Sequence, residues 1–166
     1  MRAYSQIEPG RTTQRELRDV LGQFATGVTI VTAMTDTGPI AMTANSFSSV
    51  SMDPPLVLWC PAKSSLRYPH FVKAQHYAIH VLGCDQGELA SRFAKTGADF
   101  DGVDWDVSEM NVPMLSDCLA RFECSQNQIH EAGDHAIIVG EVNTALRRDG
   151  DALLFWKGKF GGFSEA

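Results

Sequence analysis

One stretch decides how this chain folds and what it binds: Met42-Thr-Ala-Asn-Ser-Phe-Ser-Ser-Val-Ser-Met-Asp-Pro-Pro-Leu-Val-Leu-Trp-Cys-Pro-Ala-Lys-Ser-Ser65. It opens with a run rich in hydroxyl and amide side chains, from Thr43 to Ser51. A short apolar run at 56–60 follows between prolines, and Lys63-Ser64-Ser65 comes directly after it. A plain surface loop does not need an apolar strand between two clusters of polar donors. Such an arrangement suits a ligand that is flat and polar at one end and anionic at the other.

Segments of β-branched or alternating sequence lie on both sides of this stretch and predict a mainly β chain. We expect strands at 28–35, 40–46, 56–60, 76–82, 119–129, 135–142 with a continuation to 146, and 152–156. Asp36-Thr-Gly38 and Glu131-Ala-Gly-Asp134 are turn signals between them. Only two helices are expected, and they do not alternate with the strands. A β-barrel or closed sheet with peripheral helices is therefore favoured over a doubly wound parallel sheet.

The two expected helices each follow a residue pair typical of a helix start. Thr13-x-x-Glu16 fits a capping box, and the helix after it is expected at about 14–25, ending before Gly27. Its apolar residues share one helical face and are Leu17, Val20, Leu21 and Phe24. Asp85-x-x-Glu88 predicts a second helix at 86–94. We expect residues 1–12 to form a loose arm and residues 13–166 a single domain.

The last third of the chain begins with a long excursion from Lys95 to Asp117, rich in Gly, Asp, Asn and Pro. Loops of this length are uncommon and often functional. The strand after it alternates, which predicts one face directed inward and the other outward. The inward set is Ala120, Phe122 and Cys124, and the outward set is Arg121, Glu123 and Ser125.

Composition excludes several classes of protein. The chain has 166 residues, enough for one domain with a core, and a net charge of −6, which argues against nucleic acid or an acidic membrane as partner. The N-terminus lacks an apolar signal core, and no stretch is long enough to span a membrane. The four cysteines and five histidines show no metal-binding spacing, so we expect no metal site and reduced thiols. These observations predict a cytoplasmic protein.

Three segments carry side chains suited to binding. Lys63-Ser64-Ser65 can hold a phosphate, and the run 43–51 offers donors along one edge of a planar heterocycle. Gly133-Asp134-His135 places a titratable ring at a hairpin corner. Taken alone, each segment is more typical of an ordinary turn or connection, and Phe24, Phe93 and Phe160 are more typical of a core.

Their order along the chain resembles the short-chain flavin reductase family, the reductase partners of two-component flavin-dependent monooxygenases. The matching segments run in family order over most of the chain: Leu21-Gly-Gln-Phe-Ala-Thr-Gly-Val-Thr-Ile-Val-Thr32, Met42 to Leu58, Ala62-Lys-Ser-Ser65, Leu89-Ala-Ser-Arg-Phe-Ala94, Ala132-Gly-Asp-His135, Val139-Gly-Glu-Val142 and Gly158-Lys-Phe-Gly161. The resemblance implies an antiparallel split β-barrel and a homodimer with flavin near the subunit junction.

The resemblance also implies a role for each matching residue. Thr43, Asn45, Ser46 and Phe47 would line the isoalloxazine edge, Ser48 and Ser49 would extend that wall, and Lys63, Ser64 and Ser65 would hold the ribityl phosphate. Arg92 and Phe93 would lie beside the cofactor, Phe160 in the tail that closes over it, and His135 near nicotinamide, as the catalytic residue. Two positions depart from the family: His80 stands where Asn is common, and Trp59-Cys60 is bulkier than usual.

The activity that follows is an NAD(P)H:flavin oxidoreductase, in which hydride passes from nicotinamide to FMN or FAD and reduced flavin goes to a partner monooxygenase. The choice between FMN and FAD stays open. NADH is favoured over NADPH because no Arg cluster is ready for a 2′-phosphate. The alternatives are a reductase of another acceptor, such as a corrinoid cobalt, and a flavin- or haem-binding split-barrel protein without turnover.

Overall fold

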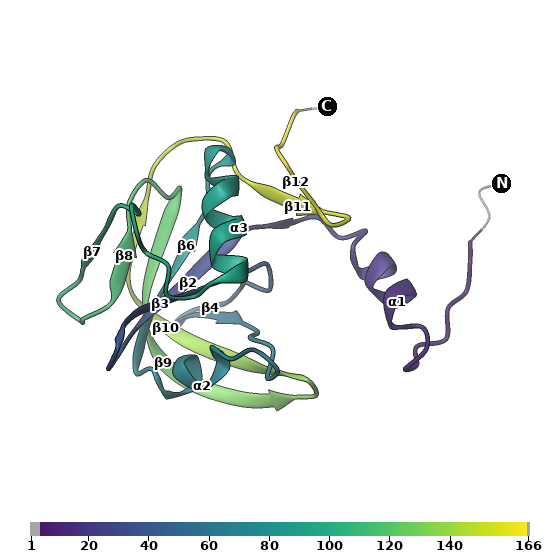
Figure 1. Cartoon of the computed structure of the whole chain (residues 1–166), viewed down its shortest axis with the longest axis horizontal. Coiled ribbons are helices and arrows are strands. Elements are labelled where there is room, and N and C mark those ends of the chain that lie inside the picture. Colours follow the sequence, from purple (N-terminus) through teal and green to yellow (C-terminus); the bar gives the residue numbers. More distant parts are fainter. Residues whose placement is uncertain (1–3, 166) are drawn as a thin grey trace.

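A computed structural model describes residues 4–165, which form antiparallel sheets with few helices (Figure 1). The strands are β1 (Thr26–Gly27), β2 (Thr29–Thr35), β3 (Gly38–Ala44), β4 (Ser48–Met52), β5 (Pro55–Trp59), β6 (His76–Val81), β7 (Trp105–Val107), β8 (Pro113–Leu115), β9 (Ala120–Ala132), β10 (His135–Arg147), β11 (Leu154–Trp156) and β12 (Lys159–Gly161). The helices are α1 (Gln14–Leu21), α2 (Tyr68–Lys73) and α3 (Gly87–Lys95), with a 3₁₀ turn, η1, at Cys84–Gln86. The prediction of a mainly β antiparallel fold with peripheral helices is confirmed.

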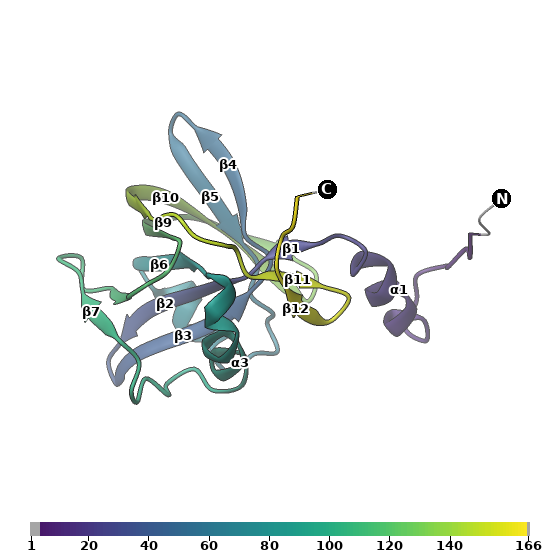
Figure 2. The same ribbon diagram turned by 90° about the horizontal axis from the view of Figure 1, so that it is seen from above.

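The largest sheet has seven strands in the order β3-β2-β6-β9-β10-β5-β4. All neighbouring pairs are antiparallel, and β3 and β4 are the two edges, so the sheet does not close into a continuous barrel. Strands β9 and β10 form its longest hairpin and are joined by Gly133-Asp134, where Gly133 has φ 66°. Two small sheets, β1-β11-β12 and β7-β8, lie at the ends of the body (Figure 2).

Strand β2 is buried on both faces, which explains its nearly continuous β-branched sequence. Ile30 packs in a cluster with Phe93 of α3, and its neighbour Val31 packs in another with Phe71 of α2. The two helices therefore cover opposite faces of the central strands. Burying a large apolar side chain of this kind stabilises a fold by about 1.5–3 kcal/mol.

Helix α1 is shorter than predicted and lies away from the sheets (Figures 1 and 2). The helix ends at Leu21, because Gly22 follows as the C-terminal cap and donates its N–H to the Arg18 carbonyl at 2.8 Å. The predicted end just before Gly27 is therefore too late. The predicted capping box is wrong, since the Thr13 hydroxyl donates backward to the Glu8 carbonyl at 2.8 Å. The division into an arm over 1–12 and one domain over 13–166 stays a prediction, and residues 1–3 lie outside the described part.

The second helix also begins differently from its prediction. Instead of an Asp85–Glu88 box, the Gln86 side chain accepts the Gly83 N–H at 2.9 Å, and α3 begins after the 3₁₀ turn. Its end at Lys95 is within one residue of the predicted end.

The excursion from Lys95 to Asp117 contains the β7–β8 hairpin and folds back over the sheet. The Ser108 hydroxyl donates to the Glu123 carboxylate, and Glu123 is only 9% exposed. The prediction that Glu123 faces outward is therefore wrong, because the excursion covers that face. Cys124 is fully buried, as its place in the alternation predicted.

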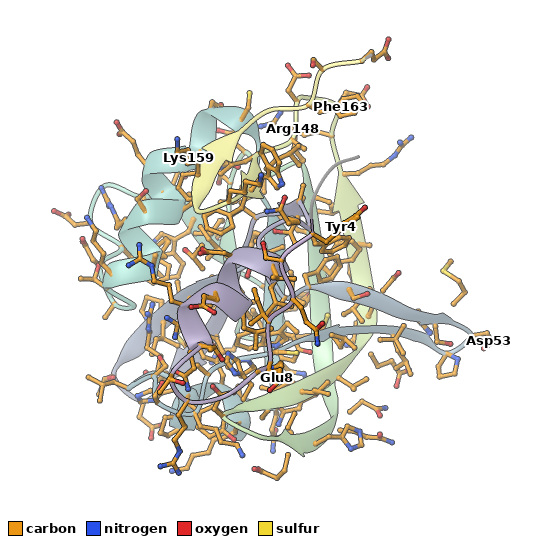
Figure 3. All side chains as sticks on the ribbon, turned by 90° about the vertical axis from the view of Figure 1, so that its right-hand side faces the viewer. Tyr4, Glu8, Asp53, Arg148, Lys159 and Phe163 are labelled. Carbon is orange, nitrogen blue, oxygen red and sulfur yellow. The ribbon has the colours of Figure 1, made fainter. Side chains whose placement is uncertain are left out.

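The polar run of the central stretch is partly strand. Residues 48–52 form β4, which pairs with β5 in a hairpin that projects from the body with Asp53 at its tip (Figure 3). Strand β3 ends at Ala44, so Asn45–Phe47 connects two strands without belonging to either. Backbone groups in this connection are outside the sheet ladder.

Candidate functional site

Three segments that are far apart in the sequence meet at one place. The Ser46 hydroxyl accepts the Cys60 N–H at 2.9 Å, which ties the β3–β4 connection to the end of β5. The Lys63 N–H donates to the Asp134 carbonyl at 2.9 Å, and Ala62 forms an isolated bridge with His135. The polar wall, the Lys-Ser-Ser loop and the Gly-Asp-His corner therefore form one continuous surface.

A cleft of about 1080 Å³ lies beside this surface, with Asn45 and His135 among its lining residues. Its other walls come from α1 and β1 and from the β11–β12 hairpin: Arg18, Asp19, Leu21, Gly22, Gln23, Phe24, Thr26, Phe155, Lys157 and Gly158. None of these ten residues was predicted from the sequence to belong to the site. Some of them could have been found from the sequence, because they belong to or adjoin two segments that match the family, at 21–32 and 158–161.

His135 is held by its neighbour. Its Nδ1 lies 2.8 Å from a carboxylate oxygen of Asp134, and its side chain is about half exposed. This hydrogen bond and the charge of His135 lower the pKa of Asp134. Because a carboxylate accepts, Nδ1 carries the proton, and Nε2 is left to accept or donate toward a ligand.

The Lys-Ser-Ser loop is a compact turn with its cation directed to the β9–β10 hairpin. The Lys63 ammonium donates to the Gly133 carbonyl at 2.7 Å and forms an ion pair with Glu131. Ser65 donates its N–H to the Ala62 carbonyl at 3.1 Å, and its hydroxyl accepts the Arg67 N–H at 3.3 Å. Ser64 is exposed. These bonds leave the Ser64 hydroxyl and part of the ammonium open to solvent.

Arg67 anchors the other end of this loop. Its guanidinium donates to the Phe93 and Ala94 carbonyls at the end of α3, and to the Ala41 carbonyl of β3 at 3.2 Å. A cation at the carboxyl end of a helix is favourable because the last carbonyls lack partners there. A Cβ on Gly97 would come within 2.4 Å of the Arg67 side chain, so that glycine leaves room for the guanidinium arm. Desolvation lowers the pKa of Arg67.

Several residues predicted to bind flavin instead direct their side chains to other parts of the protein. The Thr43 hydroxyl donates to the Ala90 carbonyl at 2.7 Å, and Phe47 stacks on Phe122 with ring centroids 5.5 Å apart. Ser48 and Ser49 are exposed on β4 and are not among the residues that line the cleft. Phe93 is 0% exposed and packs on Phe100 in the core, so the structure does not bring its ring to the cleft. The sequence had left this core interpretation of Phe93 open.

Arg92 and Phe160 line a second cavity, of about 650 Å³, together with Glu88, Ser91 and Lys95. The Arg92 guanidinium donates to the Asp101 carbonyl at 2.7 Å. Phe160 packs edge-on against Phe155, which lines the first cleft, with centroids 5.7 Å apart. The β11–β12 hairpin therefore separates the two hollows.

At the two departures from the family pattern, His80 and Trp59 lie in the core and Cys60 is half-buried. His80 is fully buried, with Nδ1 3.0 Å from the Ile30 carbonyl and Nε2 accepting the Leu115 N–H at 3.0 Å. Trp59 is fully buried between Phe71 and Tyr77. Neither residue lines the cleft, and burial raises the pKa of the neighbouring Cys60 thiol.

Residues 21–164 match the flavin reductase-like domain. The chain belongs to this family, and the resemblance drawn from the sequence is confirmed. It is 57% identical over 156 residues to "FMN reductase (NADH) SmoA" of Agrobacterium fabrum, covering 94% of this chain and 90% of that one. It is 37% identical to the flavin-dependent monooxygenase reductase subunit HsaB of Rhodococcus jostii, over 89% and 77% of the two chains.

Solved structures have the same fold. The NADH:FAD oxidoreductase SgcE6 of Streptomyces globisporus, in complex with NAD and FAD fragments, superposes with a TM-score of 0.87 at 40% identity, over 95% of this chain and 98% of that one. Among the residues that the structure describes, no helix is long and apolar enough to cross a membrane.

The residues of the cleft fit a flavin and a nicotinamide. Phe24 and Phe155 contribute apolar rings to the lining, and Asn45 and His135 contribute polar groups, which suits a flat heterocycle with one polar edge. Thr26 also lines the cleft, and its hydroxyl is buried without a hydrogen-bond partner in residues 4–165. A buried hydroxyl without a partner is costly.

Proposed function

We propose that the protein is an NAD(P)H:flavin oxidoreductase that uses NADH, reduces FMN or FAD, and supplies the reduced flavin to a separate oxygenase. The observation that carries this is the cleft shared by Asn45 and His135, in a chain that matches the flavin reductase-like family over residues 21–164. The names of its relatives support the donor, the acceptors and the two-component arrangement.

Bound flavin would supply the redox chemistry by accepting a hydride from nicotinamide. The chain's own residues bind and orient. The connection Asn45–Phe47 offers backbone N–H groups outside the sheet, suited to an electron-rich carbonyl edge. Lys63, with Ser64 and Ser65, holds the phosphate through charge-assisted bonds. His135 presents Nε2 on the nicotinamide side, while Asp134 fixes its ring.

The test follows NADH consumption in air with FMN, FAD, riboflavin or no flavin, and NADPH in a parallel series. We expect NADH oxidation that depends on added or bound flavin and is slower with NADPH. A protein that binds flavin but leaves NADH unoxidised is a carrier, and that result contradicts the proposal. If the protein reduces a corrinoid but does not reduce free flavin, the result supports the alternative, a reductase of another acceptor.

The remaining expectations also stay proposals. A homodimer is supported by exposed apolar side chains at the end of α1 and just after it: Leu21 is 64% exposed, and Phe24, which follows the helix, is 78% exposed. Both line the cleft, so a second copy that covers them would complete its wall. A cytoplasmic location is supported by the four cysteines, which are all free. A separate oxygenase partner is supported by the name of the HsaB reductase subunit.

A further inference from the structure

We propose that Glu131 sets the affinity for phosphate-bearing flavins by competing with the phosphate for Lys63. This inference rests on the proposed function, because it requires Lys63 to be the phosphate cation. Glu131, which the sequence indicated only as part of a turn, thereby gains a role in specificity.

The geometry makes Lys63 a shared cation. Glu131 is near the end of β9, and its carboxylate forms an ion pair with the Lys63 ammonium. The same ammonium donates to the Gly133 carbonyl at 2.7 Å. An ammonium has three N–H donors, so these two contacts leave one for a ligand. The Lys63 backbone is fixed by its bond to the Asp134 carbonyl, and the ammonium therefore stays within reach of Glu131.

The other carboxylate of this corner is engaged elsewhere. Asp134 accepts from His135 at 2.8 Å, and among the described residues the Lys63 ammonium forms an ion pair with Glu131 only. The Glu131 side chain is 73% exposed and that of Lys63 32% exposed. An ion pair this open to water is weak, so an incoming phosphate can displace it.

The consequence is selective by ligand. FMN and FAD carry a phosphate that competes with the Glu131 carboxylate for the charge of the Lys63 ammonium, while riboflavin has no phosphate and does not disturb the pair. Removing the carboxylate should free the ammonium and tighten FMN by about two- to fivefold, the range that corresponds to one exposed ion pair. A reductase that passes its flavin to another protein benefits from such weakened retention.

The experiment measures dissociation constants of FMN and riboflavin by flavin fluorescence for wild type, Glu131→Gln, Lys63→Met and the double variant. We expect Glu131→Gln to tighten FMN, leave riboflavin unchanged, and lose this effect at high salt, where exposed charges are screened. In the Lys63→Met background, Glu131→Gln should have no effect, because nothing is left to compete for. Glu141→Gln, an exposed carboxylate further along β10, is the matched control and should change neither constant.

The variants distinguish a failure of the proposed phosphate role of Lys63 from a failure of the inference about Glu131. If Lys63→Met leaves FMN affinity unchanged, the phosphate role of Lys63 fails, and the inference fails with it. If Lys63→Met weakens FMN but Glu131→Gln does not tighten it, only the inference fails. If Glu131→Gln tightens FMN equally with and without Lys63, the carboxylate simply repels the phosphate, and competition for Lys63 is wrong.

Discussion

His135 joins two parts of the site, since its ring bonds to Asp134 and its backbone bridges to Ala62 in the Lys-Ser-Ser loop. We expect His135→Ala to raise the Michaelis constant for NADH or slow flavin reduction by roughly ten- to a hundredfold, as loss of one charge-assisted contact does. Flavin affinity should stay unchanged, because the backbone bridge survives the substitution. Anaerobic stopped-flow reduction of the flavin-loaded variant measures both quantities.

The same variant tests the simpler role of His135 as a turn residue. If it only stabilises the hairpin corner, His135→Ala will lower the melting temperature with wild-type kinetics. Asp134→Asn is the companion variant, because it keeps a bonding partner for Nδ1 but removes the charge. A reduction rate and NADH dependence equal to wild type in His135→Ala would remove this residue from the catalytic site.

His80 predicts how stability depends on pH. Burial is the main cause that lowers its pKa from 6.5 to about 4. Between these values the unfolded chain binds more protons than the folded one, so stability falls as pH falls from about 6.5 to 4. The loss from this residue reaches about 3 kcal/mol, at 1.36 kcal/mol for each pKa unit. Urea unfolding at several pH values measures it.

His80→Asn is the control for this pH dependence, since it places there the residue that is common in the family and does not titrate. Its unfolding free energy should change less between pH 6.5 and 4 than that of wild type, whatever its value at neutral pH. An equal slope in both proteins would show that other groups govern acid stability.

Single residues also show where sequence reasoning reached its limit. Asn45 and His135 could be placed in one site because both belong to ordered motifs. Phe93 belongs to a motif as well, but its ring is enclosed by Phe100 of the excursion. Gly140, in the matching segment Val139–Val142, is likewise explained by packing, because a Cβ there would lie 2.1 Å from the buried Tyr77 hydroxyl. Motif membership alone does not separate binding from packing.

At the scale of elements, the Lys-Ser-Ser loop is fixed by neighbours that lie far away in sequence. Its first part is bound to the start of β10, and Arg67 ties its last part to α3 and β3. The strands themselves were predictable from their β-branched and alternating patterns. These tertiary bonds were not, because a guanidinium that caps a distant helix leaves no periodic signal.

Arg67→Met should therefore destabilise the protein. It leaves three carbonyls without their donor, and we expect a loss of about 1–3 kcal/mol, limited because the site is partly open to water. FMN should also bind more weakly, since the loop loses one anchor. Urea unfolding and FMN titration measure the two effects, and Arg67→Lys should fall between Met and wild type.

The control for Arg67 is Arg147→Met, which changes an exposed arginine on β10. This variant should match wild type in both measurements. If Arg67→Met unfolds at the same urea concentration as Arg147→Met, the guanidinium contacts do not contribute to stability.

In the whole molecule, α1 lies apart from the sheets (Figure 1), and no contact among the described residues of a single chain accounts for its position. The sequence predicted an amphipathic helix, and the apolar face is present, but no residue of α1 is buried. A helix of eight residues is marginal in water without a packing partner. Periodicity gives the direction of an apolar face, and it carries no information on what covers that face.

We expect a second copy to cover it, so light scattering at micromolar concentration should give about twice the monomer mass of 18.2 kDa. Replacing Leu21 and Phe24 together with Glu should shift the mass toward 18.2 kDa, because two charges cannot be buried without partners. Flavin affinity should fall in the same variant, since both residues line the cleft.

Val107→Glu, on β7 at the opposite end of the body, is the control and should keep the dimer mass (Figure 1). A wild-type mass near 18.2 kDa would contradict the dimer, and the apolar face of α1 would then need another partner.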